Sequence, residues 1–163
     1  MSLEPSEVEP ILRAALYEFV AREERLLKVD ASERSITHKL AEYVKRGFPG
    51  WDVDCEYNRY YLDPKTMLLH EYTRGGKELP KRRMRRVYPD VIVHHQVTHD
   101  NLLVLEVKKS TNPRPEDEDW EKLREFGLQL GYQTGAFVRV YVGPDYGVRP
   151  DLVWYEKGVP QNR

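Results

Sequence analysis

Two short apolar segments decide the fold that we expect for this chain: Tyr88–His94 (YPDVIVH) and Asn101–Lys108 (NLLVLEVK). Pro89 lacks a backbone N–H and can stand only at the start or edge of a strand, so Asp90 is expected to be the first properly paired residue. Both segments are continuous apolar runs of the kind found in strands covered on both faces. A polar connection around Thr98 joins them. We therefore predict an antiparallel pair of buried strands.

The spacing of these segments predicts which side chains meet. Asp90 lies eight residues before Thr98 and Glu106 eight residues after it, so a hairpin centred on Thr98 places the two carboxylates directly opposite each other. Opposed side chains of an antiparallel pair have Cβ atoms about 4.5–5.5 Å apart. Two carboxylates at that distance repel unless a positive charge lies between them. A divalent cation such as Mg²⁺, which prefers hard oxygen ligands, is the natural solution.

Lys108 follows Glu106 by two residues and therefore shares its face of the strand. A metal held by carboxylates lowers the pKa of a bound water and polarises a phosphoryl group. A lysine beside it could orient or deprotonate the attacking water and neutralise charge developing on phosphorus. Taken singly, each of these charged residues would more often lie on the wet face of an antiparallel strand. The apolar neighbours favour the catalytic interpretation, because charges at the edge of a buried strand pair need a purpose.

The remaining sequence predicts an α/β fold with a mixed central sheet flanked by helices. Ser6 and Glu9 have the spacing of a capping box for the first helix. Residues 60–86 give weak signals: Gly75-Gly76 could be a turn between two short strands, and the rest could be a long loop. The expected elements are helices over about 6–28 and 30–46, strands over 51–57, 90–94 and 102–108, a helix from 116 to 127 or 131, and strands over 136–142 and 152–155. We expect one domain over 1–163, with an N-terminal helix (1–29), a core (30–143) and a C-terminal strand and tail (144–163).

Composition excludes several classes of protein. The chain has 163 residues, of which 40% are hydrophobic and 33% charged, which is typical of a globular protein with a heavily charged surface. Its longest aliphatic run, Leu102–Leu105, is far too short for a membrane span. The acidic N-terminus does not resemble a signal peptide, and the single Cys55 excludes an internal disulfide. A cytoplasmic location is the simplest expectation.

Pro89-Asp90, a spacer, and Glu106-Val107-Lys108 at the end of an apolar strand resemble the signature of the PD-(D/E)XK nuclease superfamily. This superfamily has the restriction-endonuclease-like fold and includes Holliday junction resolvases. The resemblance spans about residues 30–143 and extends to the order of helices and strands. It implies that Asp90 and Glu106 ligate Mg²⁺ or Mn²⁺, and that Lys108 assists hydrolysis. It also implies that the main-chain carbonyl of Val107 completes the metal shell.

Many resolvase-like members add an acidic residue from the helix that precedes the sheet, and Glu33 is the candidate here. Glu33 lies three residues before Ile36 and seven before Leu40, so it belongs to the stripe that faces the core. From there its carboxylate could reach the edge of the sheet. Alternatively, Glu33 completes a capping box with Asp30 or complements the helix dipole. Both interpretations stay open at this point.

A basic run directly precedes the strand that bears Asp90. Residues 74–86 hold seven basic residues against one acidic residue. A nucleic-acid backbone is the partner that makes such a run useful beside a hydrolytic site, whereas the alternative is a solvated, mobile loop. His94, on the face of Asp90, could touch a phosphate or be a satisfied structural histidine. The candidate nucleic-acid contacts are Lys81, Arg82, Arg83, Arg85, Arg86 and His94.

Together these features predict a small Mg²⁺-dependent (or Mn²⁺-dependent) endonuclease that cuts DNA with structural or weak sequence specificity. DNA is expected chiefly because the resemblance implies it. One site per chain must act twice to cut both strands, so a homodimer is expected as well. Two alternatives stay open: a catalytically inactive module of the same fold that binds nucleic acid through Lys81–Arg86, and a subunit that only scaffolds a larger complex.

Overall fold

The computed structural model describes residues 3–162, so residues 1, 2 and 163 of the predicted domain lie outside the described residues. Its centre is a six-stranded sheet in the order β1-β6-β7-β8-β9-β10. Strands β7 and β8 run parallel, and every other neighbouring pair is antiparallel. The strands are β1 (Asp52–Cys55), β6 (Val91–His94), β7 (Asn101–Lys109), β8 (Thr134–Val140), β9 (Asp151–Glu156) and β10 (Val159–Pro160). The predicted α/β class with a mixed sheet is confirmed.

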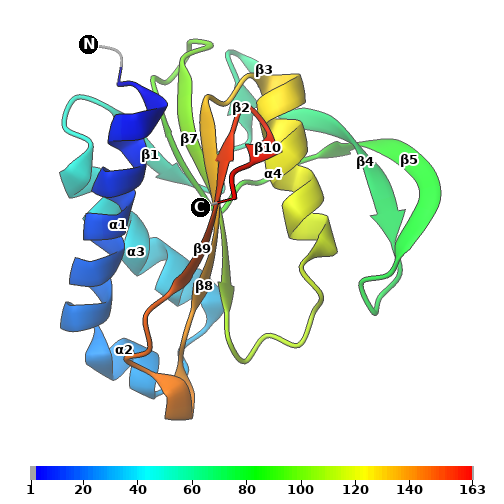
Figure 1. The fold of residues 1–163 in the computed structure, drawn as a ribbon. Coiled ribbons are helices and arrows are strands. Elements are labelled where there is room, and N and C mark those ends of the chain that lie inside the picture. Colours follow the sequence, from blue (N-terminus) through cyan, green and yellow to red (C-terminus); the bar gives the residue numbers. More distant parts are fainter. Residues whose placement is uncertain (1–2, 163) are drawn as a thin grey trace.

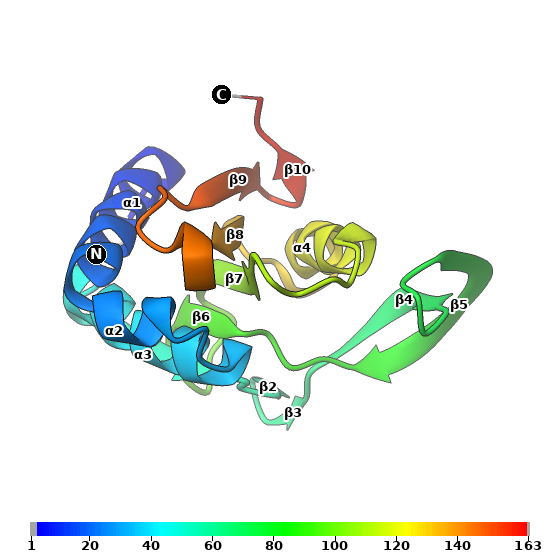
Figure 2. The ribbon, with the colours of Figure 1, turned by 90° about the horizontal axis from the view of Figure 1, so that it is seen from below.

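Helices cover both faces of this sheet (Figures 1 and 2). One face carries α1 (Pro5–Arg22), α2 (Glu24–Lys28) and α3 (Glu33–Gly47), and the other carries α4 (Asp117–Leu130). Because side chains alternate along a strand, β7 supplies both cores: Leu103 and Leu105 lie in the core under α1–α3, and Val104 lies in the core under α4. This double burial accounts for the continuous apolar runs. Within residues 3–162, no helix combines the length and apolarity needed to cross a membrane.

The predicted long N-terminal helix is two helices. The backbone leaves helical geometry at Glu23, whose carboxylate accepts a 2.5 Å hydrogen bond from the hydroxyl of Tyr43 on α3. The break lets Leu27 of α2 reach the core, where it is almost fully buried. The predicted capping box is also wrong, because α1 begins at Pro5 and Glu7, not Glu9, accepts the N–H of the residue before the helix.

Residues 59–86 form two small hairpins. The predicted turn at Gly75-Gly76 between two strands is confirmed, and the predicted long loop over the rest is wrong. β2 (Arg59–Tyr60) pairs with β3 (Asp63–Pro64), and β4 (Thr66–Tyr72) pairs with β5 (Glu78–Arg86). The β4–β5 hairpin, which we call the arm, projects beyond α4 on the side away from the sheet (Figure 2). Its turn contains Gly76 with φ 82°, a backbone conformation that glycine adopts without steric cost.

Helix α4 covers the edge of β4 that β5 leaves open. The Gln129 side chain accepts the N–H of Leu68 at 2.9 Å and donates to its carbonyl at 3.0 Å. The Glu121 carboxylate accepts the N–H of His70 at 3.0 Å. An open strand edge presents unpaired backbone groups, and these two side chains satisfy them as a further strand would. The arm is therefore anchored along its length to α4.

The close approach of α4 to the β9–β10 turn makes Gly127→Ala a test of the fold. A Cβ at Gly127 would lie 2.2 Å from the backbone nitrogen of Gly158. Glycine-to-alanine changes inside helices ordinarily stabilise by about 1 kcal/mol. Here backbone must move, and overpacking of this kind costs about 1–3 kcal/mol.

We expect Gly127→Ala to lower the midpoint of thermal unfolding measured by circular dichroism. Gly75→Ala is the matched control, because a Cβ there meets only the Thr73 hydroxyl at 3.9 Å. A Gly127→Ala protein that unfolds at or above the wild-type temperature would contradict the packing of α4 on the turn.

Candidate active site

Asp90 and Glu106 meet where β6 begins and β7 approaches its end. Val91 pairs with Leu105 in the sheet, so one step earlier in the same register Asp90 faces Glu106. The predicted register is confirmed, although β6 itself begins one residue after Asp90. The Oδ2 atom of Asp90 accepts the Val107 N–H at 2.7 Å. The Asp90 carboxylate is thereby tied to the residue between Glu106 and Lys108.

Burial raises the pKa of Asp90 to about 6. The hydrogen bond from Val107 N–H and the charge of Lys122 oppose this rise, whereas the carboxylates of Glu33 and Asp119 add to it. An isolated aspartate in water would titrate near 3.9. Asp90 is therefore buried in surroundings that disfavour its bare anion and favour a bound proton or cation.

Glu106 is buried, with only 3% of its surface exposed, and a lysine that sequence reasoning missed neutralises it. The Nζ atom of Lys122, on α4, lies 3.2 Å from Glu106 Oε2. Burial raises the pKa of Glu106 well above its usual range, Lys122 opposes that rise, and Asp90 adds to it. The other oxygen, Oε1, is buried and has no hydrogen-bond partner among the residues that the structure describes. One acceptor of this carboxylate is thus unused.

Lys108 is also buried, with 5% of its surface exposed. Its Nζ atom lies 2.5 Å from Asp119 Oδ2 and donates to the main-chain carbonyls of Arg114 and Pro115, both at 3.1 Å. The loop between β7 and α4 therefore closes over this lysine and holds its ammonium in place.

Four charged side chains from β7 and the first turns of α4 lie next to one another in space, and their charges alternate in sign. Lys122 lies 3.8 Å from Asp119 as well as 3.2 Å from Glu106, so it bridges the two carboxylates. Residues 119 and 122 are three apart on a helix and share a face, which is a weak signal readable in the sequence. The contact with β7 depends on how α4 crosses the sheet. We call the series Glu106, Lys122, Asp119 and Lys108 the charge chain.

Glu33 reaches the end of β7, as one of its two interpretations requires. Its Oε2 atom accepts the Lys109 N–H at 3.1 Å and the Asn112 side-chain amide at 2.9 Å. The side chain of Ser32 caps α3, so the predicted capping box between Glu33 and Asp30 is wrong. Glu33 also raises the pKa of Asp90, which places the two carboxylates in one electrostatic environment.

Glu33 and Asp90 line the same cavity, which has a volume of about 460 Å³ and lies between α3 and the ends of β1 and β6. Cys55 lines it too, beside Ser35, Thr37 and His38. Burial raises the pKa of the Cys55 thiol to about 11, and nearby carboxylates including Asp90 add to the rise. The thiol therefore stays protonated at neutral pH, which excludes thiolate chemistry.

The donor set fits a hard divalent cation. Asp90, Glu106 and Glu33 supply carboxylate oxygens, the ligands that Mg²⁺ and Mn²⁺ prefer. The unused Oε1 of Glu106 is the kind of buried acceptor that a cation would satisfy. The N–H and carbonyl of one strand residue point to the same neighbour, so the Val107 carbonyl is directed toward the side from which Asp90 approaches. Each predicted carboxylate ligand is at present held by a protein donor, and binding a cation requires these contacts to rearrange.

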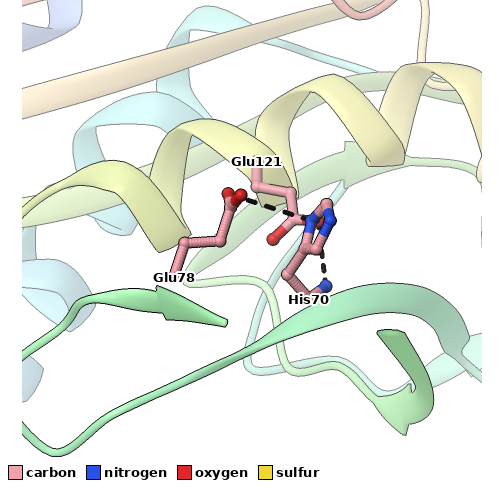
Figure 3. Close-up of side chains that lie close together, drawn as sticks. All are labelled: His70, Glu78 and Glu121. Atoms are coloured by element: carbon pink, nitrogen blue, oxygen red, sulfur yellow. Dashed lines mark hydrogen bonds and ion pairs between the residues drawn. The ribbon is translucent and has the colours of Figure 1, made fainter. Parts of the chain in front are cut away.

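A group with tighter spacing lies elsewhere, between the arm and α4 (Figure 3). His70, Glu78 and Glu121 each offer a ligand atom, and these atoms all lie within 4.8 Å of one another. However, Arg82 Nε donates to His70 Nε2 at 3.3 Å, so the Nδ1 atom carries the proton and donates to Glu121 at 2.7 Å. The Tyr72 hydroxyl donates to the second oxygen of Glu121 at 2.7 Å. These satisfied contacts identify the group as a latch that fastens the arm to α4.

The predicted basic residues all lie on β5 of the arm, so the alternative of a mobile loop is wrong. Arg83 pairs with Glu71 at 3.0 Å, and Arg85 pairs with Glu118 of α4 at 2.9 Å. The other three form no ion pair with any carboxylate of residues 3–162, and all are exposed: Lys81, Arg82 and Arg86. The arm therefore offers cationic charge to a partner outside the chain.

His94 cannot make the predicted phosphate contact in this arrangement. Only 3% of its surface is exposed, and its Nε2 atom lies 2.8 Å from Asp54 Oδ2. Its ring also packs against Tyr57 at a centroid distance of 4.8 Å. The residue lies at the end of β6, between β1 and β7, where neighbouring strands cover it. The interpretation as a satisfied structural histidine is the one that the structure supports.

Comparison with known proteins gives no family for the chain. No protein-family model matches the sequence, and no curated protein matches it. Among solved structures, the crystal structure of SSO0001 is similar at a TM-score of 0.35, with 16% sequence identity over 94% of this chain and 78% of that chain. A similarity of that size carries no argument about fold family or function.

Proposed function

We propose that this protein is a metal-dependent endonuclease with a restriction-endonuclease-like core that hydrolyses phosphodiester bonds in DNA. One observation carries the proposal: Asp90 faces Glu106 in the β6–β7 register and accepts the Val107 N–H, and the carboxylate of Glu33 reaches the end of the same strand from α3. Lys108 lies two residues after Glu106 on that strand. The register that the PD-(D/E)XK interpretation requires is present. The mixed sheet with helices on both faces supports the same interpretation.

Asp90 and Glu106 would hold the cation, with Glu33 and the Val107 carbonyl as further ligands. A divalent cation, when bound, supplies a water of lowered pKa and a Lewis acid for the phosphoryl group. Lys108 would supply an ammonium that neutralises charge developing on the phosphoryl oxygens, and to do so it must exchange one of its present partners, Asp119 and two loop carbonyls, for the substrate. The β7–α4 loop, whose carbonyls bind this ammonium, leaves only 5% of Lys108 exposed.

The arm supports a nucleic-acid substrate. Lys81, Arg82 and Arg86 are exposed and lack carboxylate partners within the described chain, so they can bind phosphates. Contacts of this kind give affinity without sequence information, which favours structural or weak sequence specificity. Because one site per chain must act on two strands, we propose a homodimer as the active form.

Nicking of a supercoiled plasmid tests the proposal. Wild type is expected to nick DNA in Mg²⁺ and in Mn²⁺ but not in EDTA. Lys108→Met keeps the length of the side chain without its charge and is expected to slow nicking by about 100-fold. Lys39→Met is the matched control, because within residues 3–162 Lys39 pairs only with Glu42, on the exposed face of α3. Nicking by wild type that persists in EDTA, or that Lys108→Met leaves unchanged, would exclude this mechanism.

A specific observation favours a second candidate, a catalytically inactive module that binds nucleic acid. Lys122 already neutralises Glu106, and Lys108 is buried, as in a site whose charges serve stability alone. Under this alternative, wild type and Lys108→Met both retard DNA in a gel and neither nicks it in any metal. If neither protein binds DNA, the scaffold interpretation replaces both.

A further inference from the structure

One face of the arm, which we call its outer face, is exposed at four of its six residues, whereas Thr66 and the latch residue His70 are half-buried. Opposed residues of an antiparallel pair share a face, and Leu68 opposes Met84 in the β4–β5 register. The alternate residues Met67 and Leu69 point into the core and are fully buried. The outer face therefore comprises Thr66, Leu68 and His70 from β4 and Arg82, Met84 and Arg86 from β5.

The outer face combines apolar and cationic groups in a fixed order. Met84 is 59% exposed and Leu68 is 37% exposed, whereas the residues on the opposite face of β4 are buried in the core. Arg82 and Arg86 flank this pair, and no carboxylate among residues 3–162 neutralises them. A surface that bound phosphates alone would have no use for the apolar pair. The order fits a partner with weakly polar groups in the middle and anions on both sides.

The groove of a nucleic-acid duplex has this chemistry, with base edges in its floor and phosphates on its rims. The major groove of B-DNA is about 12 Å wide and admits a two-stranded β-ribbon. The arm is such a ribbon, it extends beyond the body of the protein (Figures 1 and 2), and its latch to α4 holds it preformed. We propose that the outer face of the arm lies in the major groove of duplex DNA. Leu68 and Met84 then contact base edges, and Arg82 and Arg86 contact the flanking phosphates.

The turn of the arm packs on the loop that holds Lys108. A Cβ at Gly76, in the arm's turn, would lie 2.7 Å from Pro115 Cδ, so the turn packs directly on the β7–α4 loop. The carbonyl of Pro115 accepts a hydrogen bond from Lys108. The arginines on the other face of the arm, Arg83 and Arg85, are paired with Glu71 and Glu118. Within residues 3–162, the arginines of β5 without an ion pair are therefore those of the outer face, and the arm is fixed to the segment that positions Lys108.

This inference rests on the proposed nucleic-acid substrate, and binding measured without metal separates it from the proposed chemistry. The probe is a short, fluorescein-labelled, mixed-sequence DNA duplex, titrated by anisotropy in EDTA at several NaCl concentrations. Leu68→Thr/Met84→Thr should weaken binding on the order of ten-fold, with an unchanged slope of log affinity against log salt. Arg82→Ala/Arg86→Ala should flatten that slope by about 2, because each phosphate contact contributes about 0.9. The matching single strand should bind wild type more weakly than the duplex does.

Controls separate lost contacts from lost folding. Val159→Thr is the matched apolar change on an exposed strand, and Arg22→Ala/Arg46→Ala removes two arginines that both pair with Glu18. Met84→Thr alone alters the more exposed member of the pair and serves if the double variant unfolds. Equal binding by Leu68→Thr/Met84→Thr and wild type, or preference for the single strand, would overturn the groove proposal. If cleavage in Mg²⁺ persisted in that case, the nuclease proposal would stand without it.

Discussion

Glu106→Gln is expected to reduce Mg²⁺-dependent cleavage of DNA by about 100-fold or more while the protein stays folded. Glutamine preserves the shape of the side chain but removes the anionic oxygens that a divalent cation requires. The Oε1 atom of Glu106 has no partner within the described residues, so the substitution breaks no protein hydrogen bond there. Lys122, which lies 3.2 Å from Glu106 Oε2, can still donate to the glutamine oxygen there and keeps the carboxylate of Asp119 at 3.8 Å. The loss should therefore be much larger in activity than in stability.

Two measurements check this expectation: the initial rate of plasmid nicking, and the heat of Mn²⁺ binding by titration calorimetry. Glu42→Gln on α3 is the matched control, since Lys39 is its one ion-pair partner in the part of the chain that the structure describes, and the pair lies at the surface. Wild-type nicking by Glu106→Gln would show that the carboxylates of β6 and β7 are not the reactive centre. If Glu106→Gln instead binds Mn²⁺ as wild type does but no longer nicks DNA, then Glu106 is not a metal ligand.

Lys122→Met is expected to have the largest effect on stability, a loss of roughly 3 kcal/mol at pH 8 in EDTA. The reason is that Glu106 is buried to 3% exposure and Lys122 is its ion-pair partner. Removing one member of a buried pair leaves an uncompensated charge. Lys39→Met, at an exposed ion pair, should cost almost nothing by comparison.

The loss should depend on pH in a defined direction. Burial already raises the pKa of Glu106, and deleting Lys122 removes the main influence that lowers it. A carboxyl group whose pKa is higher in the folded state binds protons more strongly there, so stability falls as pH rises above its unfolded pKa. The deficit of Lys122→Met should therefore be smaller at pH 5 than at pH 8.

Urea unfolding at both pH values, together with the double variant Glu106→Gln/Lys122→Met, completes the test. The double variant contains no unpaired buried charge and should recover most of the lost stability, because neutral replacements of buried ion pairs are often tolerated. A deficit that is the same at both pH values would contradict the role assigned to Lys122. A double variant no more stable than Lys122→Met would do so as well.

The β6–β7 hairpin could be predicted because its information is local. The apolar runs define two strands, and counting residues on each side of Thr98 places Asp90 opposite Glu106 before any other element is considered. Alternation along β7 then puts Lys108 on the face of Glu106. The reach of Glu33 to the sheet edge followed from helical periodicity, but the choice between that contact and a cap needed coordinates.

The arm was predicted only in outline, since its strands have no regular apolar alternation. β5 consists mostly of exposed charged residues, which a pattern search cannot distinguish from a loop. Its strand geometry comes from pairing with β4, and β4 is held in turn by Gln129 and Glu121 from a helix 61 and 51 residues further along the chain. Contacts at such separations have no signature in the local sequence.

Residue order alone therefore specified the strands, their register and the acid, acid and lysine series at their end, because these depend on backbone alternation over short spans. The position of α4 across β7 depends on tertiary packing, because Leu123 and Phe126 are buried against the sheet and the arm. This position of α4 places Lys122 beside Glu106 and Asp119 beside Lys108. In the same way, the strands on either side of His94 bury its side chain. Which charges neutralise one another is a property of elements that meet in space, and only the folded chain brings them together.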